Sequence, residues 1–226
     1  MELLRTKVEA RAWSRARRAR GEAVGFVPTM GFLHAGHLAL MQAARERGAR
    51  LVTSIFVNPT QFGPNEDLDR YPRDLEGDLR KCAEAGNAAV FLPSAAEMYP
   101  PGAATRVEVP ALAGPLCGRD RPTHFAGVCT VVIKLFHIVE PDFAVFGEKD
   151  YQQLAIIRRM TRDLDLPVEI VGHPIVREAD GLAMSSRNAN LSPDQRRQAL
   201  ALSRWLGAAR AAWVAGERDP RALEAA

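Results

Sequence analysis

Two histidines three residues apart, His34 and His37, are side chains whose type and spacing could do chemistry in this 226-residue chain. The apolar run 23–27 predicts a buried strand, which we expect to end at Pro28 because proline has no N–H to donate. Apolar residues fall at helical spacing from Gly36 onward. The histidines therefore lie in a strand-to-helix turn, where unpaired N–H groups and the helix dipole favour an anion. We predict a phosphate-binding turn.

The glycine spacing of this turn matches neither the P-loop nor the dinucleotide-binding fingerprint. Two histidines could also bind a metal, but no further ligands lie nearby at zinc-like spacing. The other interpretation is a helix start with two satisfied histidines. The segment 34–37 resembles the His-x-Gly-His signature of the nucleotidyltransferase superfamily, which includes the class I aminoacyl-tRNA synthetases.

A second candidate is Lys149, in the segment GEKDYQQ that follows a buried apolar run and opens a helix. Only four of the 30 basic residues are lysine, so each lysine stands out. Glu148 and Asp150 flank it, which also fits a surface helix start with local ion pairs. We favour a phosphate contact, because ligands bind at the carboxyl ends of parallel strands.

The polar loop 177–188 presents two hydroxyls and a guanidinium in succession, from Ser185, Ser186 and Arg187. Taken alone such a loop is commonplace. Beside a phosphate-binding turn it predicts a second phosphate clamp, in which Arg187 forks onto a phosphate in the transition state.

Two amides next to an aromatic ring suggest a pocket for a small hydroxylated, methylated acid: Asn58 and Gln61, followed by Phe62. Amides are common in loops, so this interpretation stays open here. Gln153 lies one helical turn past the lysine and could reach the same pocket. For His124, substrate contact and satisfied loop histidine are equally compatible with the sequence. No Ser-His-Asp order or nucleophile elbow is present, so a covalent enzyme intermediate is not indicated.

Strands alternating with helices up to residue 172 predict parallel βαβ units. The fold class is therefore α/β, a Rossmann-like doubly wound parallel sheet, with the loops MGFLHAGH, NPTQF and GEKD at the carboxyl ends of its strands. We also expect one amphipathic helix over residues 1–20 and a short strand over Thr105–Val109.

We expect two domains: residues 1–173 binding nucleotide and acid, and a smaller domain over residues 174–226. Ser192 begins a capping-box pattern, and its helix should run to about Gly216. The sequence then stops inside another predicted helix, which suggests that this second domain is incomplete.

The composition, 47% hydrophobic and 25% charged, is that of a soluble globular protein. No segment has the pattern of a membrane span or secretory signal, and three scattered cysteines suit a reducing cytoplasm. The basic run Arg11–Arg20 could contact nucleic acid, but it has a helix-like charged face with little aromatic interleaving, so we favour a solvated helix face. We therefore expect a cytoplasmic protein with neither nucleic-acid nor membrane partners.

Five segments together resemble the pantothenate synthetase (pantoate–β-alanine ligase) family, from about Val24 to the end of the chain. They are PTMGFLHAGH, SIFVNPTQFGPNEDLDRYPRD, PTHFAGVCTVV, VFGEKDYQQL and READGLAMSSRN. The resemblance implies an ATP-dependent ligase that joins pantoate to β-alanine through a pantoyl-adenylate, releasing pyrophosphate and then AMP. It also implies Mg²⁺, whose ligands it leaves open, a homodimer, and a C-terminal domain that closes over the site.

The resemblance also implies roles for single residues. His37 matches the proton donor, and His34, Lys149 and Arg187 would surround the leaving pyrophosphate with it. Gln61 matches a contact to pantoate and β-alanine, Gln153 matches a pantoate contact, and we add Asn58 as a substrate contact. The implied ATP-binding residues are Met30, Gly31, Phe32, Leu33, His34, Ala35, Gly36, His37, Gly147, Glu148, Lys149, Asp150, Val176, Met184, Ser185, Ser186 and Arg187.

Two rival functions remain at this point. One is an adenylyltransferase acting on a phosphorylated cofactor precursor, which would share the histidine turn but leave NPTQFG and GEKDYQQ together unexplained. The other is a non-enzymatic RNA-binding protein that uses the run Arg11–Arg20, with strongly salt-dependent binding.

Overall fold

The computed structural model of this protein describes residues 1–225, and the chain divides into two compact units, Met1–Pro174 and Ile175–Ala226. The strands are β1 (Glu2–Leu4), β2 (Val24–Thr29), β3 (Arg50–Ile55), β4 (Ala89–Phe91), β5 (Phe143–Gly147) and β6 (Glu169–His173). The α-helices of the first unit are α1 (Lys7–Arg18), α2 (Ala35–Glu46), α3 (Leu75–Glu84), α4 (Ala95–Met98), α5 (Pro110–Ala113), α6 (Cys117–Asp120), α7 (His124–Val139) and α8 (Tyr151–Asp163). Two short 3-10 helices, η1 (Pro59–Gln61) and η2 (Glu148–Asp150), follow β3 and β5. The assignment of a nucleotide-binding domain and a lid domain, divided at residues 173 and 174, stays a prediction.

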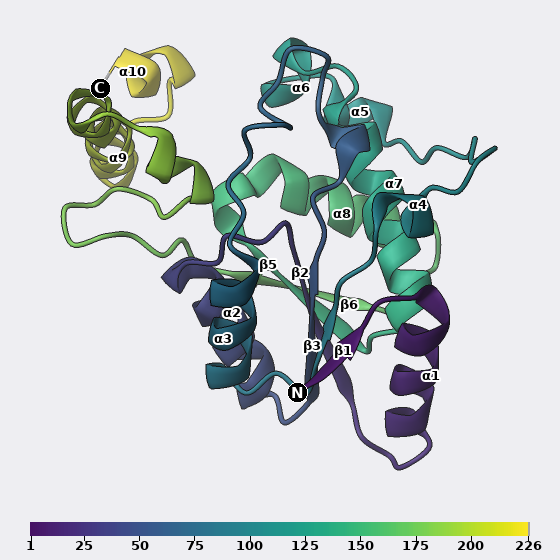
Figure 1. Cartoon of the computed structure of the whole chain (residues 1–226). Helices are drawn as coiled ribbons and strands as arrows, with labels where there is room; N and C mark the ends of the chain where they lie inside the picture. Colours follow the sequence, from purple (N-terminus) through teal and green to yellow (C-terminus); the bar gives the residue numbers. More distant parts are fainter. Residues whose placement is uncertain (226) are drawn as a thin grey trace. The chain divides into compact units, whose positions relative to one another are not determined.

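The six strands of the first unit form one sheet in the order β1-β4-β3-β2-β5-β6, and every neighbouring pair is parallel (Figure 1). From β2 the chain moves outward through β3 to β4 on one side, and later through β5 to β6 on the other. The strand order therefore reverses next to β2, and ligands of open α/β sheets bind at such a switch point. The predicted doubly wound α/β fold is confirmed.

Helices cover both faces of this sheet (Figure 1). On one face, Met41 of α2 and Cys82 of α3 belong to a core that includes Val27 and Val145. On the other face, α1, α7 and α8 build a larger core around Phe26. Burying apolar side chains on both faces explains why the strands read as nearly continuous hydrophobic runs.

The expectation of one helix over residues 1–20 is wrong at its beginning. Residues Glu2–Leu4 form β1 and pair in parallel with β4. Helix α1 starts only after Thr6, whose hydroxyl accepts from the Glu9 N–H while the Glu9 carboxylate accepts from the Thr6 N–H. This capping box fixes the helix start, and it leaves the preceding residues free to join the sheet.

Two strand expectations are also corrected. Strand β2 continues through Pro28 to Thr29. The carbonyl of Thr29 accepts from the N–H of Phe56, the residue that follows β3. The backbone of Pro28 therefore faces the opposite side, where pairing with β5 has already ended. The segment Thr105–Val109 forms no strand, because the Val107 N–H donates to the Thr130 hydroxyl of α7 and its valines pack on the core.

The second unit is built around η3 (Ser186–Asn190), α9 (Pro193–Val214) and α10 (Pro220–Ala225). Ser192 begins α9 with a capping box as predicted, and the helix ends two residues before the predicted Gly216. The Trp205 indole N–H donates to the Glu224 carbonyl and so links α9 to α10. The predicted helix over the last residues is observed as far as Ala225.

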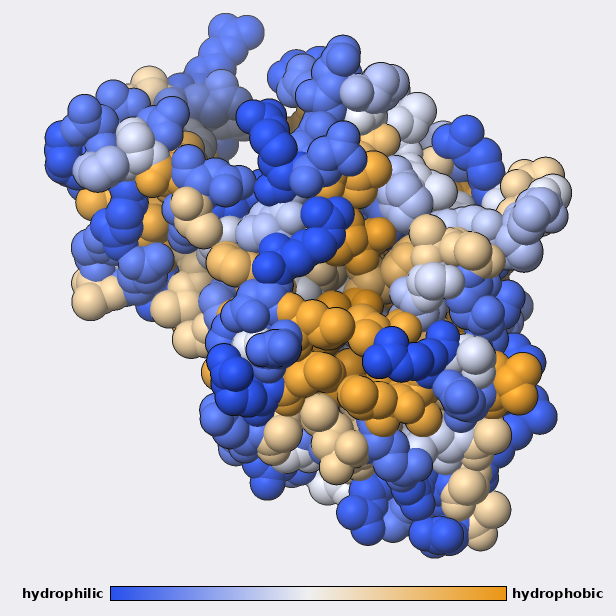
Figure 2. Space-filling model, in the orientation of Figure 1, coloured by the Kyte–Doolittle hydropathy of each residue, from blue (hydrophilic) through white to orange (hydrophobic). Residues whose placement is uncertain are grey.

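No helix within residues 1–225 is both long enough and apolar enough to span a bilayer. Strand β1 lies at one edge of the sheet and leaves Met1 and Leu3 exposed. The space-filling view shows hydrophobic residues gathered between α1 and α3, on the side where this edge lies (Figure 2).

Candidate active site

The histidine turn connects β2 to α2 through two residues in the left-handed region, Gly31 with φ of 85° and Phe32 with φ of 51°. Glycine adopts such angles without strain, whereas phenylalanine does so only when its surroundings hold it there. His34 is the N-cap of α2, and its Nδ1 accepts from the Gly36 N–H at 3.1 Å. The predicted strand-to-helix turn is thus present, with both histidines in the first turn of the helix.

The hydrogen bonds of the two rings decide which nitrogen carries the proton. His37 Nδ1 accepts from the His34 N–H at 3.3 Å, and the ring centroids lie 4.1 Å apart. Because both Nδ1 atoms accept, each neutral ring carries its proton on Nε2. The pair therefore offers two neutral N–H donors beside a helix N-terminus.

Burial and neighbouring positive charges keep these rings neutral. Burial lowers the pKa of His34, and the charges of Lys149 and Lys81 lower it further. Burial lowers the pKa of His37 to about 3, with smaller contributions from His34 and the same two lysines. A neutral His37 at physiological pH can donate a hydrogen bond to a phosphate oxygen but is not a cation.

Lys149 lies in η2, directly after the carboxyl end of β5, as predicted. Its ammonium is 3.1 Å from the Asp150 carboxylate, so the local ion pair of the alternative interpretation does exist. Its charge nevertheless reaches both histidines, which places the predicted GEKD loop beside the histidine turn. The pair with Asp150 is largely exposed and contributes little to stability.

A cavity of about 140 Å³ brings together residues from the predicted loops MGFLHAGH and NPTQF, and Phe146 and Gln153 from either side of the loop GEKD. Its polar lining includes His37, Asn58, Gln61 and Gln153. Its apolar walls are Pro28, Met30, Phe56, Val128, Val131, Val132, Leu135 and Phe146. An engineered apolar cavity of about 150 Å³ binds benzene, so this cavity has room for a small organic molecule.

The amide of Asn58 is engaged entirely within the protein. Its Nδ2 donates to Gln61 Oε1 at 3.1 Å and to the Gly127 carbonyl at 3.1 Å. Its Oδ1 accepts from the Tyr99 hydroxyl at 2.9 Å and from the Thr60 hydroxyl and N–H. With its hydrogen-bonding capacity used, Asn58 holds Gln61 by its oxygen, so the Gln61 NH₂ is the group left for a ligand.

The Gln61 NH₂ lies 3.1 Å from the Met30 sulfur, a weak acceptor. The backbone of Gln61 is also held, since His124 Nδ1 lies 2.8 Å from its carbonyl oxygen. Of the two possibilities for His124, this contact fits the satisfied loop histidine.

Three residues near the site went unrecognised as functional in the sequence: Tyr99, Asp78 and Lys81. Tyr99 orients Asn58, while Asp78 and Lys81 contact the backbone of the histidine turn. The rarity of lysine is the one signal that singled out Lys81. Nothing local marks Asp78, which looks like an ordinary charge on an amphipathic helix.

In the second unit, the predicted ATP-binding residues form a small structure of their own. The Met184 N–H donates to the Val176 carbonyl at 3.0 Å, which places the two predicted segments side by side. Ser185 is the N-cap of η3 and accepts from the Arg187 N–H, and Ser186 is buried. The roles of these residues toward ATP stay predictions.

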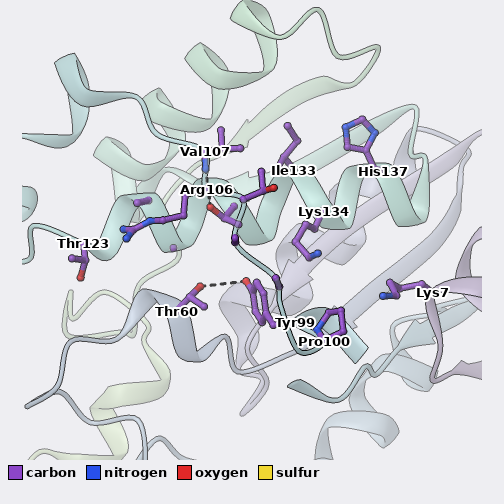
Figure 3. A pocket seen from close by; sticks show the side chains of 16 residues that line it. Lys7, Thr60, Tyr99, Pro100, Arg106, Val107, Thr123, Ile133, Lys134 and His137 are labelled. Atoms are coloured by element: carbon purple, nitrogen blue, oxygen red, sulfur yellow. Dashed lines mark hydrogen bonds between the residues drawn. The ribbon is translucent and has the colours of Figure 1, made fainter. Parts of the chain in front are cut away.

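A wider pocket of about 750 Å³ contains none of the predicted site residues. Lys7, Tyr99, Lys134 and His137 surround it, and the Tyr99 and Thr60 hydroxyls lie 3.3 Å apart at its wall (Figure 3). Thr60, Tyr99 and Gly127 line this wider pocket, and each forms a hydrogen bond with Asn58 of the smaller cavity.

The family model described as pantoate-beta-alanine ligase matches residues 2–226. The chain belongs to the pantoate–β-alanine ligase family. The pantothenate synthetase of Pelotomaculum thermopropionicum is 59% identical over 223 residues, which are 99% of this chain and 79% of that protein. The resemblance of the five segments to this family is confirmed, and with it the prediction of an ATP-dependent acid–amine ligase.

Solved structures agree with the family. The pantothenate synthetase of Thermus thermophilus is 53% identical, with a TM-score of 0.94, covering 100% of this chain and 80% of that one. The pantoate–β-alanine ligase of Francisella tularensis is 36% identical, with a TM-score of 0.83, covering 90% and 78%. That structure holds β-alanine and a β,γ-form of ATP.

Proposed function

We propose that this chain condenses pantoate with β-alanine using ATP, and that the residues around His37 carry out the first half of the reaction. The supporting observation is the cavity in which His37, Gln61 and Gln153 meet, next to a turn suited to phosphates. In the first half, a carboxylate oxygen of pantoate attacks the α-phosphorus of ATP, forming pantoyl-adenylate and releasing pyrophosphate. In the second half, the β-alanine amine attacks the acyl carbon and AMP leaves.

The first half moves negative charge onto the leaving pyrophosphate, so positioned donors matter more than a nucleophile. The Nε2–H groups of His34 and His37 and the ammonium of Lys149 supply such donors in the first unit. In the second unit, Ser185, Ser186 and Arg187 supply hydroxyls and a guanidinium. Because the histidine donors are neutral, they bind the phosphate oxygens without transferring a proton in the ground state.

The acid would bind with its methyl groups against the apolar walls and its oxygens toward the two glutamines. Asn58 turns the Gln61 NH₂ outward, so Gln61 meets an acceptor such as a carboxylate or hydroxyl oxygen. A neutral amide orients the carboxylate without neutralising it, and therefore leaves its nucleophilicity intact. The second half then depends mainly on proximity and on keeping water from the adenylate.

Mg²⁺ would accompany ATP and neutralise charge on its phosphates. Residues 1–225 contain no group of three or more histidine, cysteine or acidic side chains placed to hold a metal. We therefore expect phosphate oxygens and water to supply most of the Mg²⁺ ligands, and we assign the metal no protein ligand. The homodimer and the cytoplasmic location remain further parts of the proposal, supported by family membership.

Isotope exchange separates this ligase from the adenylyltransferase. Labelled pyrophosphate should exchange into ATP when pantoate is present and β-alanine is absent, because adenylation is a complete and reversible half-reaction. Gln61→Ala should raise the pantoate concentration needed for exchange and leave ATP affinity nearly unchanged. Acids without pantoate's hydroxyls should support little exchange. Exchange that needs no pantoate, or that needs a phosphorylated acceptor, would refute the proposal.

A further inference from the structure

A buried carboxylate on α3 holds the backbone of the histidine turn. Asp78 is 1% exposed, and its two oxygens accept from two successive N–H groups: Phe32 to Oδ2 at 2.7 Å and Leu33 to Oδ1 at 2.6 Å. Hydrogen bonds to an ionised acceptor are short and about twice as strong as neutral ones. Both oxygens of the carboxylate are thus committed to the turn.

One helical turn along α3, Lys81 holds the other side of the same peptide segment. Its ammonium donates to the Leu33 carbonyl at 2.8 Å. The N–H and the C=O of Leu33 are therefore fixed by an acid and a base three residues apart on one helix. We call Asp78 and Lys81 the α3 clamp.

The clamped segment is the strained part of the turn. Phe32 has a φ of 51°, in a region that non-glycine residues occupy only when their surroundings impose it. Gly31 has no room for a side chain, since a Cβ would lie 2.9 Å from Asp78 Oδ2. The residue after Leu33 is His34, the N-cap of α2, so the clamp sets the direction in which the histidine pair leaves the turn.

We propose that Asp78 and Lys81 are positioning residues for adenylation, acting through the backbone of Phe32 and Leu33 on His34 and His37. This inference rests on the proposed function, in which the histidine donors meet the ATP phosphates. The clamp imposes the strained turn before ATP arrives, so ATP binding does not have to form it. Its loss affects ATP and the adenylation rate, whereas the acid-binding amides on η1 and α8 stay in place.

The first test compares two isosteric changes on the same helix. Asp78→Asn replaces one carboxylate oxygen with an NH₂ group, which faces an N–H of the turn and cannot accept from it. Asp74→Asn changes the N-cap of α3 and leaves the contacts of the turn unchanged. Asp78→Asn should lower kcat/KM for ATP in the exchange assay by about 100-fold, the usual cost of misplacing reacting groups by about 1 Å. The KM for pantoate should stay unchanged, and Asp74→Asn should match the wild type in both.

Amide hydrogen exchange provides a readout that does not depend on activity. In the ATP-free protein, the Phe32 and Leu33 N–H groups should exchange faster in Asp78→Asn than in the wild type or in Asp74→Asn. Faster exchange with wild-type ATP kinetics would show a purely structural contact and overturn the inference. Wild-type protection at both amides would overturn the clamp itself. Absence of pyrophosphate exchange in the wild type would instead overturn the proposed function and the catalytic role built on it. In that case the amide measurement alone would still test whether Asp78 holds the turn.

Two changes at Lys81 separate the effect of its hydrogen bond to Leu33 from the effect of its positive charge. Unlike Asp78→Asn, neither change places a second N–H donor against an N–H of the turn. Lys81→Met removes the donor to Leu33, whereas Lys81→Gln keeps a neutral donor. The clamp predicts that Lys81→Gln recovers much of the ATP kcat/KM lost in Lys81→Met. Equal losses in both variants, with normal kinetics in Asp78→Asn, would assign the effect to positive charge near the phosphates and overturn the inference.

Discussion

At the scale of single residues, His37 combines a buried ring with a backbone hydrogen bond that leaves only Nε2–H for a ligand. Its pKa of about 3 in the folded protein lies below the ordinary value of 6.5. Between these two pH values the unfolded chain binds more protons than the folded one. This histidine therefore makes the free energy of unfolding fall as the pH falls from about 6.5 toward 3.

His37→Asn should flatten this acid dependence, which for one proton can reach about 1.4 kcal/mol per pH unit. Urea unfolding of the wild type and the variant at several pH values between 7 and 4 measures it. An unchanged slope in His37→Asn would contradict the neutral buried ring.

Lys149 and Lys7 form a matched pair of lysines for the phosphate assignment. Lys149 follows the carboxyl end of the inner strand β5, and its charge acts on both histidines. Lys7 follows the edge strand β1, and its charge is not among those that lower the pKa of either histidine. Lys149→Ala should slow adenylation by about 10²- to 10³-fold, as does removal of a donor to developing negative charge in other enzymes. Lys7→Ala should leave the rate of pyrophosphate exchange unchanged. Equal effects of the two changes would mean that Lys149 serves only its ion pair with Asp150.

At the scale of elements, α7 lies against η1 and sets the position of the amides that we propose bind the acid. A Cβ on Gly127 would lie 2.3 Å from the Thr60 carbonyl oxygen and 2.6 Å from the Gln61 Cα. Both are backbone atoms, which cannot move aside by changing rotamer. The glycine therefore permits the approach that lets the Gly127 carbonyl accept from Asn58.

Gly127→Ala should destabilise the protein by about 1–3 kcal/mol, the usual cost of overpacking, and should raise the KM for pantoate. Gly207→Ala on α9 is the control, because its Cβ would meet nothing within 4 Å. There the higher helix propensity of alanine should stabilise the helix by about 0.8–1 kcal/mol. Denaturant unfolding together with pantoate kinetics measures both. A neutral Gly127→Ala would show that η1 can shift without consequence for the acid.

At the scale of the whole molecule, each of the two units carries predicted ATP-binding residues. ATP should therefore slow amide exchange in residues 30–37 and 147–150 of the first unit, and in residues 184–187 of the second. Hydrogen exchange of the wild type with and without ATP measures all three segments, and Lys149→Ala should weaken the protection throughout. Protection confined to the first unit would contradict the assignment of Val176 and Met184–Arg187 to ATP.

The alternation of apolar runs with helical spacing already determined the parallel α/β sheet and its ligand-binding edge. Strand, turn and helix start are local properties of consecutive residues, so the turn around His34 and His37 could be predicted without the rest of the chain. The order of the five family segments was specific enough to identify the ligase family. Local patterns failed to predict the secondary structure where contacts with a distant segment decide it. Strand β1 forms because it pairs with β4, and Thr105–Val109 forms no strand because its Val107 N–H donates to Thr130 of α7.

Only the tertiary structure decided how the site residues are held. Asp78 meets the Leu33 N–H across 45 residues of chain, and Tyr99 meets Asn58 across 41. No periodicity or propensity encodes such pairs, because they depend on which helices and loops the sheet brings to the same edge. The substrate contact of Asn58 stays a prediction, and the structure adds that its amide donates to Gln61 and so orients it. The types of the reacting groups are thus a property of the sequence, and their orientation is a property of long-range packing.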